Sequence, residues 1–219
     1  NNFDNSIAIA FSKFFDILPS KFKEAIVVFS ALGNLGIFLL ISGVLLILLK
    51  KTRKIGLVCL LSVLFTLIFN DLIFKNIFDR ARPFEDPNLI NNLVSIVNNN
   101  NTVYGLKPDS PSFPSGHTFQ FFATFSVFLF FYIKRKEERT FYLPYVIFFG
   151  IFGILMGFSR VLLSHHYFSD VIVGAIIGFI IGISSFYIIE YSPTLFNKIK
   201  VKLLKEKNIL SKIMIIEKS

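Results

Sequence analysis

Three short segments beside the apolar stretches of the chain carry the side chains that could do chemistry. They are residues 75–83, 114–117 and 159–170. The first places a lysine and an arginine seven positions apart, at Lys75 and Arg82. Both side chains match the charge of phosphate oxygens, and the guanidinium fork also matches their geometry. This segment is a candidate anion site, although the pair alone is equally typical of interfacial side chains that reach toward water.

The second segment reads Pro-Ser-Gly-His and opens an apolar stretch. Ser115 is a favoured helix-capping residue, and Gly116 allows another group to approach the backbone closely. The positive end of the helix adds to both features, so together they favour an anion site. Taken alone, the tetrapeptide is more typical of a plain helix cap than of a catalytic loop.

The third segment holds a histidine and an aspartate four positions apart, His166 and Asp170. On one helix these side chains share a face, so the carboxylate can hold the imidazole tautomer and stabilise its cation. Arg160 lies at the end of an apolar helix, where a charge without a partner is costly and therefore indicates function. His165 is predicted to project from a different side of the turn and to take no part.

Together the three segments predict phosphoryl transfer without a metal ion. Two histidines can divide the roles of nucleophile and general acid, while lysine and arginine stabilise charge on the phosphoryl oxygens. The sequence has no acidic cluster suited to Mg²⁺ or Ca²⁺, and its 3 histidines and single cysteine are poorly spaced for zinc. We therefore expect no metal and no cofactor. Asp71 lies one helical turn before Lys75. Two interpretations of it are equally supported: an ion pair that supports Lys75, or simple solvation of the carboxylate at the membrane surface.

The elements that position these segments are predicted from composition. Apolar residues make up 53% of the chain, charged residues make up 17%, and the mean hydropathy is +0.65. A soluble domain carries about a quarter charged residues, so we expect an all-α, polytopic membrane helical bundle. The apolar stretches predict five transmembrane spans, at about residues 25–49, 55–74, 116–133, 143–163 and 169–189.

Three regions follow from these spans. Residues 1–23 mix phenylalanines with Asp4, Lys13 and Asp16, and they are too short and too charged to cross a bilayer. They are predicted to form an interfacial amphipathic helix. Residues 24–190 would form the transmembrane catalytic domain, and residues 191–219 would form a basic cytoplasmic tail.

The distribution of basic residues predicts which way the bundle faces. Residues 50–54, 134–139 and 190–219 together hold 15 of the 23 lysines and arginines but only 5 of the 14 acidic residues. Cytoplasmic loops of membrane proteins carry such an excess, so these segments are predicted to be cytoplasmic. Residues 75–114 and 164–169 would then face the outside of the plasma (inner) membrane. The same pattern explains the net charge of +9 and leaves little reason to expect a nucleic-acid partner.

The three polar segments also resemble the signature of the type 2 phosphatidic acid phosphatase superfamily in residue type, order and spacing. That signature reads Lys-x6-Arg-Pro, Pro-Ser-Gly-His and Ser-Arg-x5-His-x3-Asp, and with the interleaved spans the resemblance covers about residues 25–190. It implies an all-helical bundle with the site at the membrane surface. In such a site His166 attacks phosphorus, Asp170 orients His166, and His117 protonates the leaving oxygen before it activates water. The resemblance further implies that the phosphoryl oxygens are held by Lys75, Arg82, Ser115, Gly116 and Arg160.

The resemblance and the charge pattern lead to an integral membrane lipid phosphatase that forms a phosphohistidine. We expect undecaprenyl pyrophosphate as the substrate, because an outward site matches its leaflet; phosphatidic acid or phosphatidylglycerol phosphate comes next, then lipid A phosphate. Head-group choice is expected to reside in residues 84–113 and the N-terminal helix. A membrane transporter is the non-enzyme alternative, but its helices would be polar or broken at mid-membrane, whereas these spans are nearly pure Phe, Leu and Ile. The bilayer and a lipid phosphate are the expected partners, and the sequence makes no prediction of oligomeric state.

Overall fold

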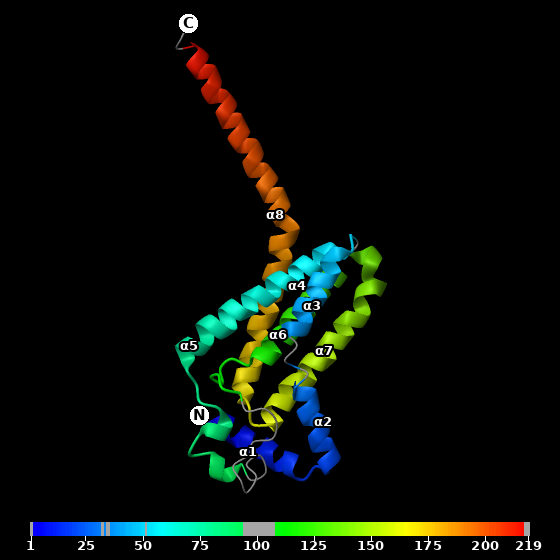
Figure 1. The fold of residues 1–219 in the computed structure, drawn as a ribbon, viewed down its shortest axis with the longest axis vertical. Coiled ribbons are helices and arrows are strands. Elements are labelled where there is room, and N and C mark those ends of the chain that lie inside the picture. The colour runs from blue at the N-terminus through cyan, green and yellow to red at the C-terminus, as the bar shows by residue number, and fades with distance from the viewer. Residues whose placement is uncertain (1, 32, 34–35, 51, 94–107, 217–219) are drawn as a thin grey trace.

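The computed structural model describes residues 2–31, 33, 36–50, 52–93 and 108–216. Within these ranges every regular element is a helix, and the long helices stand side by side as a bundle (Figure 1). The α-helices are α1 (Asn2–Asp16), α2 (Ser20–Ala31), α3 (Gly36–Leu48), α4 (Arg53–Thr66), α5 (Lys75–Phe78), α6 (Gly116–Lys134), α7 (Arg139–Leu162) and α8 (Phe168–Ile216). A π-helical segment, η1 (Leu67–Phe74), joins α4 to α5, and the short 3₁₀ turns are η2 (Pro83–Glu85), η3 (Ile90–Asn92) and η4 (Lys136–Glu138). The expected all-α helical bundle is confirmed; of the predicted head-group segment, residues 94–107 lie outside the described residues.

In the described part of the chain, four helices are long and apolar enough to cross a membrane. They are Arg53–Glu85, Gly116–Lys134, Lys136–Leu162 and Phe168–Pro193. They coincide with the second to fifth predicted spans. Apolar side chains on their outer faces, such as Ile151 and Ile154, are 53% and 54% exposed, which suits contact with lipid chains rather than with water.

The first predicted span, residues 25–49, is not one helix. α2 ends at Ala31 and α3 begins at Gly36, and they have 12 and 13 residues, whereas about 20 are needed to cross the hydrocarbon. Gly33 lies between them, and a Cβ atom there would overlap the ring of His117. Glycine permits this close approach and also weakens a helix, so the residue that brings the chain onto His117 also favours the interruption. Among the described residues 4 helices are long enough to span a membrane, roughly consistent with the five spans that the sequence predicted.

Helix α6 packs most extensively against α8. Gly174, Gly178 and Gly182 recur every four positions on α8, and a Cβ atom at each would overlap a backbone oxygen of α6 or of its cap residue. Small residues at this spacing let helix backbones touch within a membrane. An apolar cluster from α4, α6, α7 and α8, with Phe131 stacked on Tyr142, fills the other end of the bundle. This packing fixes the starts of α6 and α8, which carry parts of the second and third polar segments, against each other.

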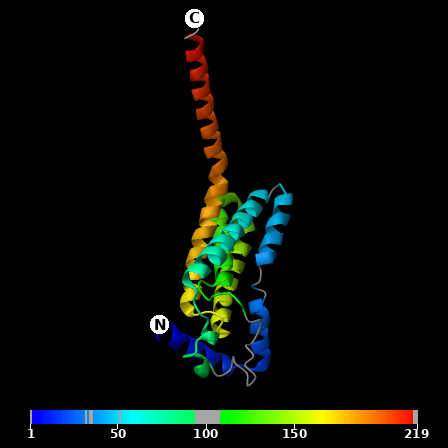
Figure 2. The ribbon, with the colours of Figure 1, turned by 60° about the vertical axis from the view of Figure 1, so that its left-hand side comes forward.

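The two ends of the bundle differ in charge. At one end, Lys54 and Arg135 lie 3.2 and 3.5 Å from the Glu190 carboxylate, so the basic segments before α4 and after α6 are neighbours. The opposite end carries the turns after α5 and α7 and the start of α6 (Figure 1). Helix α8 continues past the bundle at the basic end to Ile216 (Figure 1 and Figure 2). Most of the predicted tail therefore extends this helix.

Helix α1 lies across the end of the bundle that holds the polar segments (Figure 1). The predicted helix of residues 1–23 is shorter in the structure, because α1 ends at Asp16 and Pro19 precedes a new helix. Proline lacks the N–H that would continue a helix and disfavours helical geometry in the residue before it. One face of α1 is buried against the protein, through Asp4, Ala8, Ser12 and Phe15. The position of α1 at the membrane interface stays a prediction.

Candidate active site

The three polar segments meet at one end of the bundle around a cavity of about 470 Å³. Helix termini supply several of its side chains: Lys75 begins α5, His117 lies in the first turn of α6, and Arg160 lies in the last turn of α7. The cavity is lined by Lys75, Arg82, Pro108, Asp109, Ser110, Gly116, His117, Arg160 and His166. The structure thus brings together all three predicted cations and both predicted catalytic histidines.

The π-helical segment η1 positions Lys75. It winds more widely than the α-helix before it and ends directly at Lys75; such segments often occur at functional sites. Lys75 Nζ donates hydrogen bonds to Asp71 Oδ1 at 2.7 Å and to Ser110 Oγ at 3.2 Å, so Lys75 and Asp71 form an ion pair. Asn70 in η1 lies against Gly116, where a Cβ atom would come within 2.9 Å of the Asn70 Nδ2. Glycine at this position therefore lets α6 begin close to η1.

Two buried arginines face the cavity without a carboxylate partner. Arg82 and Arg160 are 2% and 5% exposed, and neither forms a salt bridge with a described carboxylate. Arg82 donates to the backbone oxygens of Ser110 at 2.8 Å and His165 at 2.6 Å. Arg160 Nη1 donates to Ser30 Oγ at 2.8 Å, and Arg160 Nε has no hydrogen-bond partner in the described part of the chain. Buried cations need a compensating charge, so this pair indicates that an anion binds in the cavity.

The ring of His166 is buried and held by hydrogen bonds at the cavity. It is 2% exposed, and its Nδ1 lies 2.6 Å from the Ser112 carbonyl oxygen, which can only accept, so Nδ1 carries the proton. The other nitrogen, Nε2, lies 3.3 Å from Arg82 Nη1, and His166 lines the cavity. Burial, followed by the positive charges of Arg82 and Arg160, holds the pKa of His166 well below its usual value of 6.5. The ring is therefore neutral at pH 7 and keeps a lone pair on Nε2.

Ser112 lies between Asp170 and His166. Asp170 Oδ2 is 3.8 Å from His166 Nδ1, and it accepts hydrogen bonds from Ser112 Oγ at 2.5 Å and from the backbone N–H of Tyr167 at 2.9 Å. The sequence predicted that His166 and Asp170 share a helix face, but α8 begins at Phe168, so His166 precedes the helix. That prediction is wrong for this reason. The carboxylate still lies close enough to stabilise a cationic ring.

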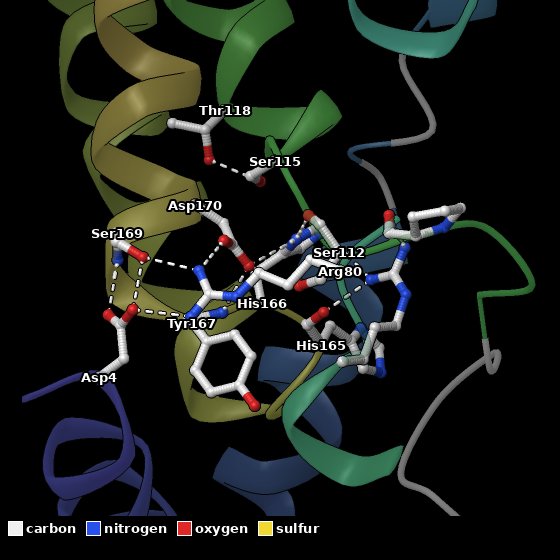
Figure 3. Close-up of polar contacts among 12 residues, drawn as sticks. Asp4, Arg80, Ser112, Ser115, Thr118, His165, His166, Tyr167, Ser169 and Asp170 are labelled. Atoms are coloured by element: carbon white, nitrogen blue, oxygen red, sulfur yellow. Dashed lines mark hydrogen bonds and ion pairs between the residues drawn. The ribbon is translucent and has the colours of Figure 1, made fainter. Parts of the chain in front are cut away.

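The start of α6 contributes Gly116 and His117 to the cavity lining but not the Ser115 side chain. Ser115 is the cap residue, yet it makes no side-chain capping bond, and its Oγ lies 3.0 Å from Thr118 Oγ1 (Figure 3). The hydroxyl of Ser115 is therefore turned into the helix packing. The phosphate contacts predicted for Ser115 and Gly116 both stay predictions.

Several residues around the site were not predicted. They are Asp4, Ser30, Arg80, Ser110 and Ser112. Arg80 lies inside the first polar segment, so its type and position offered a signal, and Asp4 is a charged residue on the buried face of α1. The serines offered no signal in the sequence. Ser112, for example, contacts His166 through its backbone oxygen, which every residue type has. His165 lies outside the cavity lining, with its ring edge-on to Phe84 at 6.0 Å between ring centroids.

A second cavity, of about 500 Å³, adjoins the first and shares Lys75, Gly116 and His117 with it. The rest of its lining combines apolar and polar side chains: Gly33, Leu40, Val63, Leu67, Asn70, Asp71 and Gln120. Leu40 and Leu67 are each 47% exposed, so this cavity reaches the apolar outer surface between α3 and the α4–η1 helix. A lipid chain would therefore have a path from the bilayer to His117.

The family model of the PAP2 superfamily matches residues 55–193, which is more than half of the chain. The chain belongs to the PAP2 superfamily. The match runs from α4 to α8 and includes all three polar segments, so the family resemblance in the motifs is confirmed. No curated protein matches the chain.

A solved structure has a similar fold. It is the crystal structure of the first transmembrane PAP2 type phosphatidylglycerolphosphate phosphatase from Bacillus subtilis. The likeness covers 89% of this chain and 88% of that one, with a TM-score of 0.63 and 24% sequence identity. At this identity the likeness shows the fold. Together with the four apolar spans, PAP2 membership makes this chain an integral membrane hydrolase of phosphate esters.

Proposed function

We propose that this PAP2 protein is a metal-independent lipid phosphatase that transfers a phosphoryl group first to His166 and then to water. One observation carries the proposal: the neutral His166 ring holds its proton on Nδ1 and lines a cavity together with buried guanidinium groups that pair with no described carboxylate. A nucleophile, positive charge for the phosphoryl oxygens and a nearby proton donor, His117, are the parts that phosphoryl transfer needs.

The geometry supports a two-step reaction. In the first step, the Nε2 lone pair of His166 forms a bond to phosphorus while the bond from phosphorus to the leaving oxygen breaks, and His117 gives that oxygen a proton. His166 is then a phosphorylated cation, which the Asp170 carboxylate stabilises from 3.8 Å. In the second step, water attacks phosphorus and gives a proton to the now neutral His117. The phosphorus–nitrogen bond breaks, and neutral His166 and inorganic phosphate result.

The cations divide the work of charge stabilisation. Arg82 and Arg160 are buried and have no carboxylate partner among the described residues, so their charge is available to the phosphoryl oxygens. The Arg160 Nε–H, which has no described partner, is a donor that a phosphoryl oxygen would satisfy. Lys75 shares its charge with Asp71, so it contributes less than a free lysine would.

The second cavity gives the leaving group its place. His117 lies in the lining of both cavities, so the oxygen that it protonates would sit where they join. The lipid part would extend past Leu40, Val63 and Leu67 toward the bilayer. This arrangement supports lateral entry of a lipid phosphate between apolar helices.

One observation bears on the choice of lipid. Undecaprenyl pyrophosphate was placed first because an outward site matches its leaflet, and its leaving group is itself a phosphate. Asp71 lines the leaving-group cavity together with Lys75, and their ion pair leaves little net positive charge there to bind a second phosphate. We therefore place lipid phosphate monoesters, such as phosphatidylglycerol phosphate or phosphatidic acid, ahead of undecaprenyl pyrophosphate, with lipid A phosphate after both.

Phosphate release from a panel of these lipids tests the function. Purified protein in detergent should hydrolyse at least one of them, with a higher kcat/KM for the monoesters than for undecaprenyl pyrophosphate. Asp71→Asn keeps the side-chain size but leaves the Lys75 charge uncompensated, so it should raise the relative rate on the pyrophosphate. A panel in which no lipid phosphate is hydrolysed, while the protein remains folded, would contradict the proposed function itself.

Metal removal should leave the activity intact. No group of three or more His, Cys, Asp or Glu side chains that could hold a metal ion occurs among the described residues. The activity in EDTA should therefore equal the activity without it, while vanadate, which mimics the trigonal-bipyramidal phosphoryl group, should inhibit. A loss of activity in EDTA that Mg²⁺ restores would show that the charge is supplied by a metal.

We further propose that the active site faces the extracytoplasmic side of the plasma membrane. Asn92 and Lys136 are both exposed and lie at opposite ends of the bundle, and Cys59 is buried. In a Cys59→Ala background, Asn92→Cys should react with a membrane-impermeant maleimide in intact spheroplasts, whereas Lys136→Cys should react only after lysis. The reverse labelling pattern would place the site in the cytoplasm.

A further inference from the structure

We propose that Arg80 and Asp4 are positioning residues that hold the Asp170 carboxylate beside His166, and that the N-terminal helix α1 is thereby part of the catalytic structure. This inference rests on the proposed function, because it concerns the role of Asp170 in that reaction. Neither residue belongs to the signature: Arg80 lies between the two signature cations of the first segment, and Asp4 lies far from all three segments in the sequence.

Arg80 joins three groups around the start of α8 (Figure 3). Its Nη1 donates to Asp170 Oδ1 at 2.5 Å and to Ser169 Oγ at 2.8 Å, and its Nη2 donates to Asp4 Oδ2 at 2.8 Å. The guanidinium also stacks over the Tyr167 ring, 3.9 Å from the centroid, which fixes its plane. Arg80 does not line the phosphate cavity, so its charge serves the carboxylates and not the substrate.

Asp4 completes this network from helix α1. It is 1% exposed, and in addition to Arg80 it accepts hydrogen bonds from the Ser169 backbone N–H at 3.1 Å and the Ser169 hydroxyl at 2.6 Å. Burial alone would raise the pKa of Asp4, but the hydrogen bonds from Ser169 and Arg80 outweigh it and lower the pKa below its usual value. The carboxylate is therefore charged at neutral pH. A helix that only lay on a membrane would turn such a charge toward water, whereas α1 turns it into the protein.

The network continues from Asp170 to the nucleophile. Arg80 holds Oδ1 of Asp170, while Ser112 and Tyr167 hold Oδ2, so the fully buried carboxylate is fixed from both sides. The backbone oxygen of Ser112 in turn accepts a hydrogen bond from His166 Nδ1–H. Removing one partner of a buried ion pair leaves an uncompensated charge, which is strongly unfavourable. Without Arg80, Asp170 Oδ1 would lose its charged donor, so the carboxylate would be held from one side only and less firmly oriented toward Ser112 and the phosphorylated cation of His166.

The expected effects fall on kcat more than on KM. Arg80→Gln should lower kcat about 10- to 100-fold, the range seen when groups that orient a reacting residue are removed. KM should change by less than about threefold, because the cavity cations still bind the phosphate. Arg80→Lys keeps the positive charge but lacks the planar guanidinium that donates from two nitrogens, so it should recover part of the loss. Asp4→Asn should lower kcat about 3- to 10-fold, since Arg80 keeps its direct contact with Asp170.

Asp16→Asn is the matched control for Asp4→Asn. It makes the same change on the same helix, but Asp16 is exposed and its carboxylate lies 3.7 Å from Lys23, away from the network. Its kcat should equal that of the wild type. Equal losses in Asp4→Asn and Asp16→Asn would overturn the assignment of Asp4.

A double-mutant cycle separates positioning from general structural support. Rates are measured on p-nitrophenyl phosphate and on a lipid phosphate that the wild type hydrolyses. The melting temperature of each variant is recorded as well. If Arg80 acts through Asp170, the loss caused by Arg80→Gln should shrink to less than about twofold in an Asp170→Asn background. The same loss in both backgrounds, or an unchanged kcat in Arg80→Gln, would overturn the proposal.

The two proposals fail in different ways. Folded wild-type protein that releases no phosphate from any substrate overturns the proposed function together with this inference. An active wild type combined with an Arg80→Gln variant at full kcat overturns this inference alone. If Arg80→Gln does not fold, the same cycle with Asp4→Asn and Asp170→Asn decides: a loss that disappears in the second background supports the network, and an additive loss overturns it.

Discussion

Replacing His166 by alanine is expected to lower kcat by at least about 10⁴-fold, since removing a nucleophile from a group that acts as a unit has effects of this size or larger. The ring supplies the atom that bonds to phosphorus, and no other described histidine has both a carbonyl-held Nδ1 proton and a cavity-facing Nε2 beside a buried arginine. Phosphate release by the purified variant in detergent, measured on the best lipid of the panel, checks this result.

The adjacent histidine provides the control. His165→Gln keeps the backbone oxygen that accepts a hydrogen bond from Arg82, and its ring packs against Phe84 outside the cavity lining. It should lose less than about tenfold, because no bond to substrate is removed. If His166→Ala keeps activity within tenfold of the wild type, or if the two variants lose the same amount, His166 is not the nucleophile.

His117→Ala is expected to show a loss that depends on the leaving group. On a lipid phosphate, whose alkoxide needs a proton to depart, kcat should fall about 10²- to 10⁴-fold, the range typical of a general acid. On p-nitrophenyl phosphate, whose phenolate leaves without a proton, the first step should be nearly retained. The second step needs His117 to activate water, so the variant should give a burst of p-nitrophenolate equal to the enzyme concentration, followed by slow turnover.

A variant that removes charge instead of a proton provides the comparison. Arg160→Gln takes away a buried guanidinium from the phosphoryl oxygens and should lower the rates on both substrates by about the same factor, on the order of 10² to 10³. Its loss should therefore be independent of the leaving group. If His117→Ala also lost the same factor on both substrates and gave no burst, its role as proton donor would be excluded.

Most of the fold could be predicted because apolar stretches of about 20 residues can cross a bilayer only as helices. This principle placed the second to fifth spans, but it could not show that Gly33 comes against His117 and that α2 and α3 are separate helices. Hydropathy reports the average character of a stretch. A break set by the contact of one glycine with a distant side chain does not change that average.

The site was predicted where residue type and spacing carry the chemistry, and it was missed where contacts join distant parts of the chain. Lys75, Arg82 and His166 could be predicted in this way. The contact of Arg80 with Asp4 spans 76 positions, and that of Asp4 with Ser169 spans 165, so no local pattern reveals them. The sequence predicted that His166 and Asp170 lie on one helix face. In the structure His166 lies in the turn before α8, and Ser112 hydrogen-bonds to both residues.

The position of phosphate on the trapped enzyme tests the central claim most directly. His117→Ala protein is mixed with p-nitrophenyl phosphate, quenched in alkali during the burst, digested, and examined by mass spectrometry. The predicted result is one phosphate per enzyme, stable in alkali and labile in acid, on His166, and none in the His166→Ala/His117→Ala protein. Phosphate on another residue, or a burst of p-nitrophenolate with no phosphorylated peptide, would contradict transfer through His166.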